Sequence, residues 1–263
     1  MNGEAYGKFS AHIGRYPLVI IAPDDIQLII GASEERRKFI DTLLSQLDPE
    51  YLRHLIAYTK ILQQRNSFLR NYQKNYSKDL SVLDILDEQL STSGDHIFEK
   101  RRSFLLEFLP QVKLLYNDIC QRYEDVNLLY ESEMHNQPVS EWLKNNRQKD
   151  LMLQRTASGI HRDDLMIQLS NQPFKNIASQ GQRKSMLFAL KLAEMETIKK
   201  QKYLSPILLL DDVFEKLDEE RITNLLTRIV EDEETQVFIT DTNCKRLEDK
   251  IAGLSGTYQM IAV

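Results

Sequence analysis

Residues 206–212 read Pro206-Ile207-Leu208-Leu209-Leu210-Asp211-Asp212, an apolar run that ends in two carboxylates. A continuous apolar run of this kind is typical of a strand buried in a parallel sheet. Ligands of open α/β sheets gather at the carboxyl ends of the strands, which is where the two acids fall. The first acid could hold Mg²⁺ and the second could orient an attacking water. A surface turn with two solvated acids would give the same residues, so both interpretations stay open on this stretch alone.

Further strands and helices are predicted on either side of this run. The predicted strands are Leu18–Ile21, Leu165–Leu169, Val237–Thr240 and, at an edge, Tyr258–Val263. The predicted helices are Gly181–Lys200 and a second helix from Glu219 to about Val230, which Asp218 can cap. Alternation of strand and helix argues for an α/β layer with a mainly parallel sheet.

Residues 23–154 are expected to be almost entirely helical. Apolar residues recur at near-helical spacing from Tyr51 to Arg70. Ser33 can cap a helix that carries acids in its first turn, where the helix dipole favours them. Pro49 and Pro110 are expected near helix starts or breaks. The region therefore predicts a helical lobe.

The bulk composition limits the function classes. The chain has 263 residues, 42% of them hydrophobic and 28% charged, as in an ordinary soluble globular protein. It contains no apolar run of membrane-spanning length, and Met1–Glu4 does not resemble a signal peptide. Cys120 and Cys244 lie far apart, so we expect neither a disulfide framework nor a zinc site, and a cytoplasmic location fits. The net charge of −5 argues mildly against strong DNA binding by this chain alone.

A second candidate site precedes the predicted helix 181–200. Ser179-Gln180-Gly181-Gln182 places a small hydroxyl and a glycine at a helix amino terminus. Free N–H groups and the helix dipole favour an anion there, and glycine lets the backbone approach a phosphate closely. A plain helix cap and turn remains the alternative.

These motifs together resemble ABC-type ATPases. Ser179–Gln182 resembles the signature motif, Asp211 and Asp212 resemble the Walker B acids, and Glu215–Asp218, with Lys216 and Asp218, resembles the D-loop. Within that class the chain is similar to the RecF family over nearly its whole length. The segments that carry this likeness are Ala22–Ile26, Ser33–Asp41, Tyr51-Leu52, Gln64–Asn66 and Gly159–Leu165. Ile160 stands where many relatives have proline, and Asp212 stands where most ABC ATPases have glutamate.

The resemblance implies an α/β fold: a partial ABC-type ATPase head with a mainly parallel sheet plus an inserted all-helical lobe. Residues 1–31 and 155–263 would form the head, and residues 32–154 the lobe. It implies a DNA replication and repair protein that binds ATP and Mg²⁺ and forms a homodimer through shared ATP. Its partners would be DNA and the recombination-mediator proteins of the RecF pathway.

The resemblance also assigns residue roles. Asp211 would hold Mg²⁺, Asp212 would position the water, and Ser179, Gln180, Gly181 and Gln182 would clamp a partner's ATP in trans. Asp241 or Thr242 falls where many ABC ATPases place a switch histidine. His161 and Arg162 could contact nucleotide, partner or DNA, or could form only a structural turn. Arg36, Arg37 and Lys38 could contact DNA or a partner, although a solvated helix face is the favoured alternative.

One expected motif is missing. No Gly-x-x-x-x-Gly-Lys-[Ser/Thr] phosphate-binding loop occurs in these residues. We expect a product that lacks the amino-terminal portion of the family and has little ATPase activity alone. Two alternatives are a short partner or regulator that supplies only the trans signature motif, and a helical scaffold without a nucleotide role.

Overall fold

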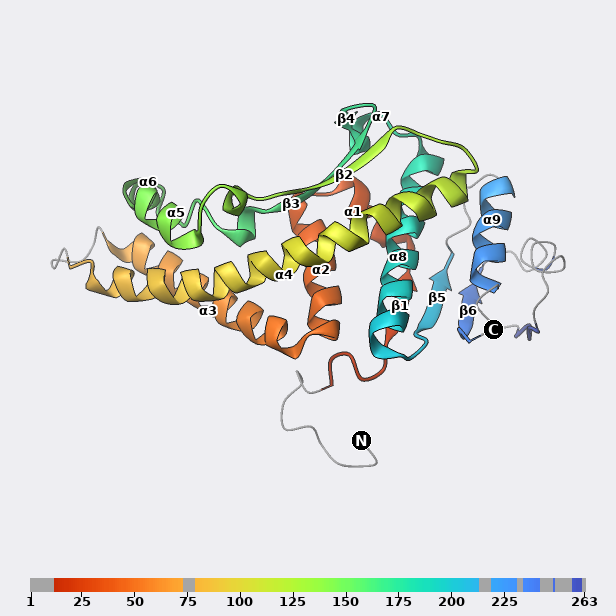
Figure 1. Cartoon of the computed structure of the whole chain (residues 1–263), viewed down its shortest axis with the longest axis horizontal. Helices are drawn as coiled ribbons and strands as arrows, with labels where there is room; N and C mark the ends of the chain where they lie inside the picture. The colour runs from red at the N-terminus through yellow and green to blue at the C-terminus, as the bar shows by residue number, and fades with distance from the viewer. Residues whose placement is uncertain are drawn as a thin grey trace. The chain divides into compact units, whose positions relative to one another are not determined.

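The computed structural model describes residues 12–72, 79–212, 219–230, 234–241, 248 and 257–261. Figure 1 draws the whole chain. It divides into two compact units, each assembled from three stretches of chain. Unit 1 comprises the described parts of Met1–Gly14, Ala32–Glu107 and Leu128–Met166. Unit 2 comprises the described parts of Arg15–Gly31, Phe108–Asn127 and Ile167–Val263.

The first half of the chain holds most of the helical residues. Its elements are β1 (Leu18–Ile21), η2 (Pro23–Ile26), α1 (Gln27–Ile30), α2 (Ser33–Leu47), α3 (Pro49–Tyr72) and α4 (Ser81–Cys120). The elements that follow are β2 (Val126–Glu131), η3 (Glu133–His135), α5 (Val139–Asn145), α6 (Arg147–Leu153) and η4 (Ile160–Arg162). The last group is β3 (Asp164–Leu169), β4 (Gln172–Pro173), α7 (Phe174–Ile177), α8 (Gln180–Lys202), β5 (Ile207–Asp211), α9 (Glu219–Val230) and β6 (Val237–Thr240).

Unit 2 is built on the parallel sheet β1-β5-β6. Side chains alternate across it, so that Val19, Ile21, Leu208 and Leu210 are buried on one face. Helix α8 packs against this sheet and buries an apolar stripe that includes Leu190. Each fully buried aliphatic side chain contributes about 2 kcal/mol relative to exposure. The predicted α/β class with a parallel sheet is therefore confirmed.

Unit 1 contains the helical lobe. Helices α2 and α3 pack on one another, and α6 packs on α3. Tyr51 and Tyr58 from α3 are fully buried, as are Leu43 from α2 and Leu90 from α4. A second sheet has the order β2-β3-β4, and its strands β2 and β3 contribute residues to both units. The helical lobe is confirmed, with strand residues added to it.

Several local predictions are wrong. Residues 126–131 form strand β2 inside the range expected to be helical. Pro110 lies within the 40-residue helix α4 instead of ending a helix. The ring removes the N–H that would bond the Leu106 carbonyl. Because Leu106 is 73% exposed, water can solvate that carbonyl.

Two end positions also differ from prediction. Ser33 is the first residue of α2, and Ala32 holds the cap position without a side-chain bond. Residues 258–261 are not a strand, and 262–263 lie outside the described residues, as does the expected cap Asp218. Among the described helices, none is both long enough and apolar enough to cross a membrane.

Candidate functional site

Acidic and hydroxyl side chains meet at the carboxyl ends of β5 and β6. The parallel register sets Asp211, the last residue of β5, opposite Thr240, the last residue of β6. The Thr240 hydroxyl donates to Asp211 Oδ1, and the Asp212 amide donates to the Thr240 carbonyl at 3.1 Å. Asp241 follows directly after β6. The two predicted Walker B acids and the predicted switch residue Asp241 therefore lie at one edge of the sheet.

Asp212 has an unusual backbone for its position. Its φ is 45°, in the left-handed region that non-glycine residues rarely adopt. Aspartate tolerates this region better than most residues. The conformation turns the chain immediately after the strand and keeps the second acid at the sheet edge.

The second predicted motif begins helix α8. Ser179 is the N-cap, and its hydroxyl accepts from the Gln182 amide at 3.2 Å. The Gln182 side chain accepts from the Ser179 amide at 2.8 Å, which completes a capping box. The amides of Gln180 and Gly181 precede the first i→i−4 bond of the helix, so the helix itself cannot satisfy them. These two amides and the positive end of the helix dipole form an anion-favouring surface.

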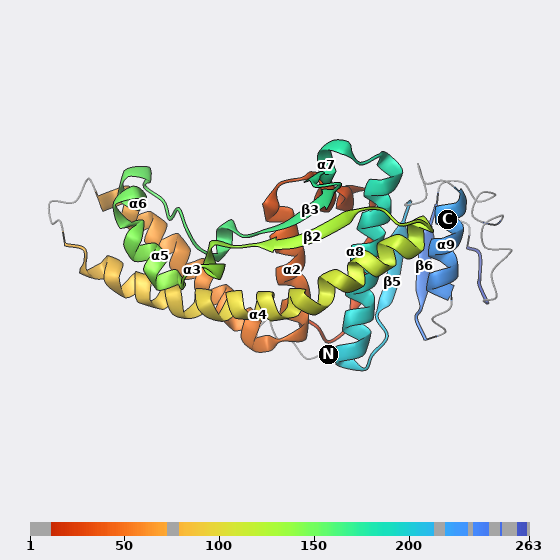
Figure 2. The ribbon, with the colours of Figure 1, turned by 45° about the horizontal axis from the view of Figure 1, so that its top comes forward.

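Helix α8 runs antiparallel to β5 within unit 2 (Figures 1 and 2). The amino terminus of α8 and the carboxyl end of β5 therefore lie at the same end of this unit. The predicted Walker B acids and signature motif occupy that end.

Sequence reasoning missed Arg221 beside the signature motif. A Cβ placed on Gly181 would collide with the Arg221 guanidinium, which comes from the first turn of α9. Arg221 is only 7% exposed. Its fixed charge lies beside the amino terminus of α8 and adds to the local preference for an anion. The sequence did carry a signal for this residue, because Arg221 is a basic residue early in the predicted helix that follows Asp211 and Asp212.

Glu124 anchors the other side of the same motif. Its carboxylate accepts from the Gln182 side-chain Nε2 at 2.8 Å and from the Tyr116 hydroxyl at 2.6 Å. Burial and the Glu124 carboxylate raise the pKa of Tyr116 well above its usual value. Tyr116 therefore stays protonated and donates, which holds Gln182 in its capping rotamer.

The donor set at the sheet edge suits a hard cation. Carboxylate and hydroxyl oxygens are the ligands that Mg²⁺ prefers in proteins, and Asp211 is exposed at the strand end. Asp211 could hold such an ion, with Asp212 positioned one residue further on.

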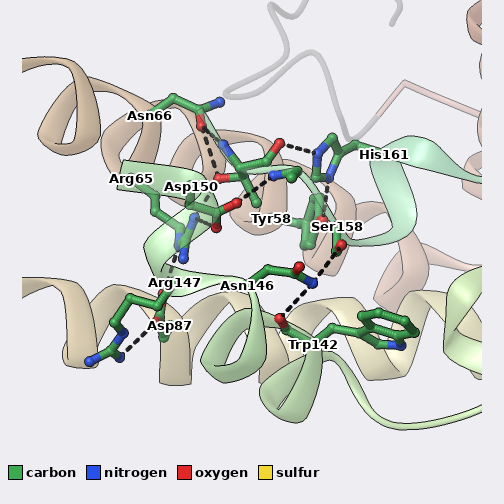
Figure 3. Close-up of polar contacts among 12 residues, drawn as sticks. Tyr58, Arg65, Asn66, Asp87, Trp142, Asn146, Arg147, Asp150, Ser158 and His161 are labelled. Carbon is green, nitrogen blue, oxygen red and sulfur yellow. Dashed lines mark hydrogen bonds and ion pairs between the residues drawn. The ribbon is translucent and has the colours of Figure 1, made fainter. Parts of the chain in front are cut away.

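His161 lies in unit 1, in a hydrogen-bonded turn (Figure 3). Its Nδ1 pairs with the Tyr58 hydroxyl at 2.8 Å, and its Nε2 lies 3.3 Å from the Thr156 carbonyl. Burial lowers the pKa of His161 to about 4, so the ring is neutral near pH 7. The carbonyl partner assigns the proton to Nε2, which leaves Nδ1 to accept from Tyr58. Gly159, at φ 137°, makes the turn possible, since a side chain there would also meet Tyr58.

A buried ionic network extends this turn (Figure 3). Arg65 is fully buried and donates to Asp87 at 2.6 Å, to Asp150 at 2.7 Å and to Thr156 at 2.8 Å. Asn66 accepts from the Thr156 amide at 2.7 Å. The Gln64–Asn66 segment therefore ties α3 to α4, α6 and the loop before His161.

Three arginines fix the segment that follows the turn. Arg36 pairs with Asp164 through two bonds of 2.7 and 2.9 Å, and Arg37 donates to the Asp163 carbonyl. Arg101 is 1% exposed and donates to Asp163 at 2.9 Å and to Asp41 at 2.7 Å. Burial raises the pKa of Asp163, while Arg101 opposes that rise. The favoured expectation of a solvated helix face is therefore wrong for Arg36, which is 7% exposed, and Arg37 is half-buried, whereas Lys38 and Arg162 are exposed.

Some predicted site residues fall outside this description. Lys216, Asp218 and Thr242 lie outside the described residues. His161 and Arg162 belong to unit 1, whereas the acids and the signature motif belong to unit 2.

Comparison with known proteins supplies the family. A scan against models of protein families matched none. The DNA replication and repair protein RecF of Flavobacterium johnsoniae is 45% identical over 259 residues, 98% of this chain and 72% of that protein. RecF of Parabacteroides distasonis is 40% identical over 262 residues, 100% of this chain and 71% of that protein.

Solved structures agree with these relatives. The recombination mediator protein RecF-ATPrS of the RecFOR pathway has a TM-score of 0.81 and 26% identity, over 92% of this chain and 67% of that one. RecF-ATP of the same pathway has a TM-score of 0.76 and 27% identity, over 88% of this chain and 64% of that one. The mixed helix and sheet architecture is thus that of an ABC-type ATPase head with a helical lobe. The chain belongs to the RecF family of DNA replication and repair proteins.

Proposed function

We propose that this protein acts in recombinational gap repair as part of a RecF-type ATPase that dimerises through ATP and binds DNA. Its residues supply the Mg²⁺-binding acid of one nucleotide site and the signature clamp of a partner's site. They supply no phosphate-binding loop, so we expect them to hydrolyse no ATP alone. Its partners would be DNA, a second RecF-type subunit and the recombination-mediator proteins of the pathway, in the cytoplasm.

The amino terminus of α8 carries this proposal. Two amides that the helix cannot satisfy, the helix dipole and the Arg221 guanidinium all favour an anion at this point. The capping box between Ser179 and Gln182 holds the turn rigid, and the Ser179 hydroxyl can still donate its proton to a phosphate oxygen. A γ-phosphate presented by a partner subunit has the charge and oxygen geometry for this surface.

The sheet edge supplies the complementary half. Asp211 would hold Mg²⁺, and the Thr240 hydroxyl orients that carboxylate. When bound, the ion neutralises charge on the β- and γ-phosphates. Asp212 would accept a hydrogen bond from the attacking water and so direct its lone pair. Asp241, at the end of the adjacent strand, is the described candidate for sensing the γ-phosphate.

Complementation tests the trans clamp. The complete F. johnsoniae relative is prepared with arginine at the residue aligned with Ser179, which should stop its own ATP turnover. Adding this chain should restore turnover, because its intact signature motif can complete the relative's nucleotide site. Phosphate release with Mg²⁺ is measured against the concentration of added chain.

Two variants of this chain make the test specific. Ser179→Arg should abolish the restoration, whereas Ser67→Arg, at an exposed position of α3, should leave it intact. Equal restoration by both variants would contradict the clamp. ATP turnover by this chain alone would contradict the proposal that a complete nucleotide site needs a phosphate-binding loop from another chain.

A further inference from the structure

Two histidines and a glutamate converge where α3 lies beside α4 in unit 1. Glu50 and His54 are one helical turn apart on α3, and His96 comes from the middle of α4. The potential ligand atoms of the three side chains all lie within 4.8 Å of one another. The cluster belongs to neither the sheet edge nor the signature motif.

The two imidazole rings contact each other and make few hydrogen bonds to other groups. Their rings stack with centroids 4.0 Å apart and an interplanar angle of 21°. His96 Nε2 is buried without a hydrogen-bond partner among the described residues. A buried polar nitrogen without a partner costs free energy, which a bound ligand can recover.

The charges around the cluster permit a cation. Glu50 Oε1 lies 4.0 Å from His54 Nε2 and brings a negative charge. Asp48 is paired with Lys100 at 2.6 Å and stays outside the cluster.

Arg53 is the competing group. Its guanidinium donates to Glu50 at 3.0 Å and approaches His54 Nε2 at 3.4 Å. The Arg53 side chain is 71% exposed, so it can swing into water at little cost. The ligand atoms must then close to about 3.3 Å, the spacing that Zn–N bonds of about 2 Å impose in a tetrahedron.

We propose that Glu50, His54 and His96 bind one zinc-class divalent transition-metal ion that clips α3 to α4. Two imidazole nitrogens and one carboxylate are ligands that Zn²⁺ accepts, with water in the fourth position. The proposed site uses no cysteine, so it departs from the expectation of no zinc site, which rested on the separation of Cys120 and Cys244. Mg²⁺ and Ca²⁺ prefer oxygen ligands alone and should not compete. The ion would add a second link between α3 and α4, besides the buried Arg65–Asp87 ion pair, so it should stabilise the lobe.

Metal titration of the chelator-treated chain tests the site. Isothermal titration calorimetry should give one saturable Zn²⁺ site per chain, and Zn²⁺ but not Mg²⁺ should raise the Tm. Co²⁺ should give the visible absorption of a four-coordinate nitrogen and oxygen site. Because even outer-shell changes cost metal sites 10–100-fold, His54→Gln or His96→Gln should weaken binding by at least about tenfold.

Matched variants decide the outcome. His12→Gln removes an exposed imidazole outside the cluster and should bind Zn²⁺ like the parent. Glu50→Gln changes a half-exposed side chain, so it keeps the test valid if either histidine variant unfolds. No saturable Zn²⁺ binding, or equal binding by the parent, Glu50→Gln and the histidine variants, would overturn the site.

Discussion

The interiors of the two units differ, because unit 1 encloses arginine–carboxylate pairs beside its apolar side chains, whereas helix α8 of unit 2 packs mainly apolar side chains. In unit 1, Arg65 and Arg101 are among the largest fully buried side chains, and each bonds carboxylates from distant parts of the chain. In unit 2, α8 buries methionine, leucine and alanine against an apolar sheet. A buried ion pair is tolerated only while both partners are present, whereas the stability of an apolar core depends on side chains that fill its volume. We therefore expect unit 1 to fail when one charge is removed, and unit 2 to fail when a cavity is made.

Arg65→Ala should give the largest effect. It leaves Asp87 and Asp150 in the interior without their shared cation, which costs about 4 kcal/mol. Urea unfolding monitored by hydrogen exchange should show the loss in unit 1. Arg70→Ala, at an exposed position of the same helix, is the control and should stay within about 0.5 kcal/mol of the parent.

The double variant Arg65→Met/Asp150→Leu sharpens this prediction. Replacing Arg65 and Asp150 with apolar groups removes one of the two carboxylates that Arg65→Ala leaves behind, and the other, Asp87, still pairs with Arg147 at 2.8 Å, so stability should recover by about 2 kcal/mol relative to Arg65→Ala. No recovery would show that the arginine acts through its shape and not its charge.

Leu190→Ala should cost about 3 kcal/mol, through the lost transfer free energy and the cavity left in α8. Hydrogen exchange should place this loss in unit 2. Leu204→Ala, where the side chain is half-exposed, should cost far less. If hydrogen exchange showed the loss of stability in unit 1 instead, the division of the chain into units 1 and 2 would be contradicted.

The turn at His161 predicts a pH dependence of stability. Its folded-state pKa of about 4 lies below the ordinary value of about 6.5, so the unfolded chain binds more protons between these limits. The contribution of the neutral His161 ring to the free energy of unfolding is fully present above about pH 6.5 and is lost as the pH falls toward 4. Between pH 6.5 and 4.5 the parent should lose about 2 kcal/mol more than His161→Gln. Parallel pH profiles of the two proteins would disprove this protonation state.

The smallest predicted change concerns Gly181. Gly181→Ala should destabilise the chain by about 1 kcal/mol, because the new methyl group displaces the buried Arg221 guanidinium. In an Arg221→Ala background the same change should be neutral or stabilising, since alanine favours a helix over glycine. A double-mutant cycle of urea unfolding measures this coupling, and additive effects would exclude the contact.

The apolar strands were the elements of the fold that could be predicted well from the sequence. Val237–Thr240 and the run before Asp211 are strands because continuous apolar residues suit a sheet covered by a helix. Strand β2 was missed, because its six residues follow a long helical pattern without a strong turn signal. Helix α4 continues through Pro110 at a turn where Leu106 is exposed, so water can reach the carbonyl that the proline ring leaves without a donor, which no residue pattern reveals.

The placement of some candidate site residues was predictable from the sequence, whereas their roles stay predictions. The two acids and the signature serine fell at one end of unit 2, because strand ends and helix starts can be located from polarity. Arg65, Arg101 and Arg221 were not predicted as buried, because charged residues on amphipathic helices usually face water. The Glu50–His54 spacing was visible, but His96 joins them only through the packing of α3 against α4.

The most direct test of the trans clamp is association with a complete relative. Multi-angle light scattering would follow this chain mixed with the F. johnsoniae protein, with and without a slowly hydrolysed ATP analogue. We predict a mixed dimer only with nucleotide, lost with Ser179→Arg and kept with Ser67→Arg. Association that ignores nucleotide, or that survives Ser179→Arg, would contradict the account.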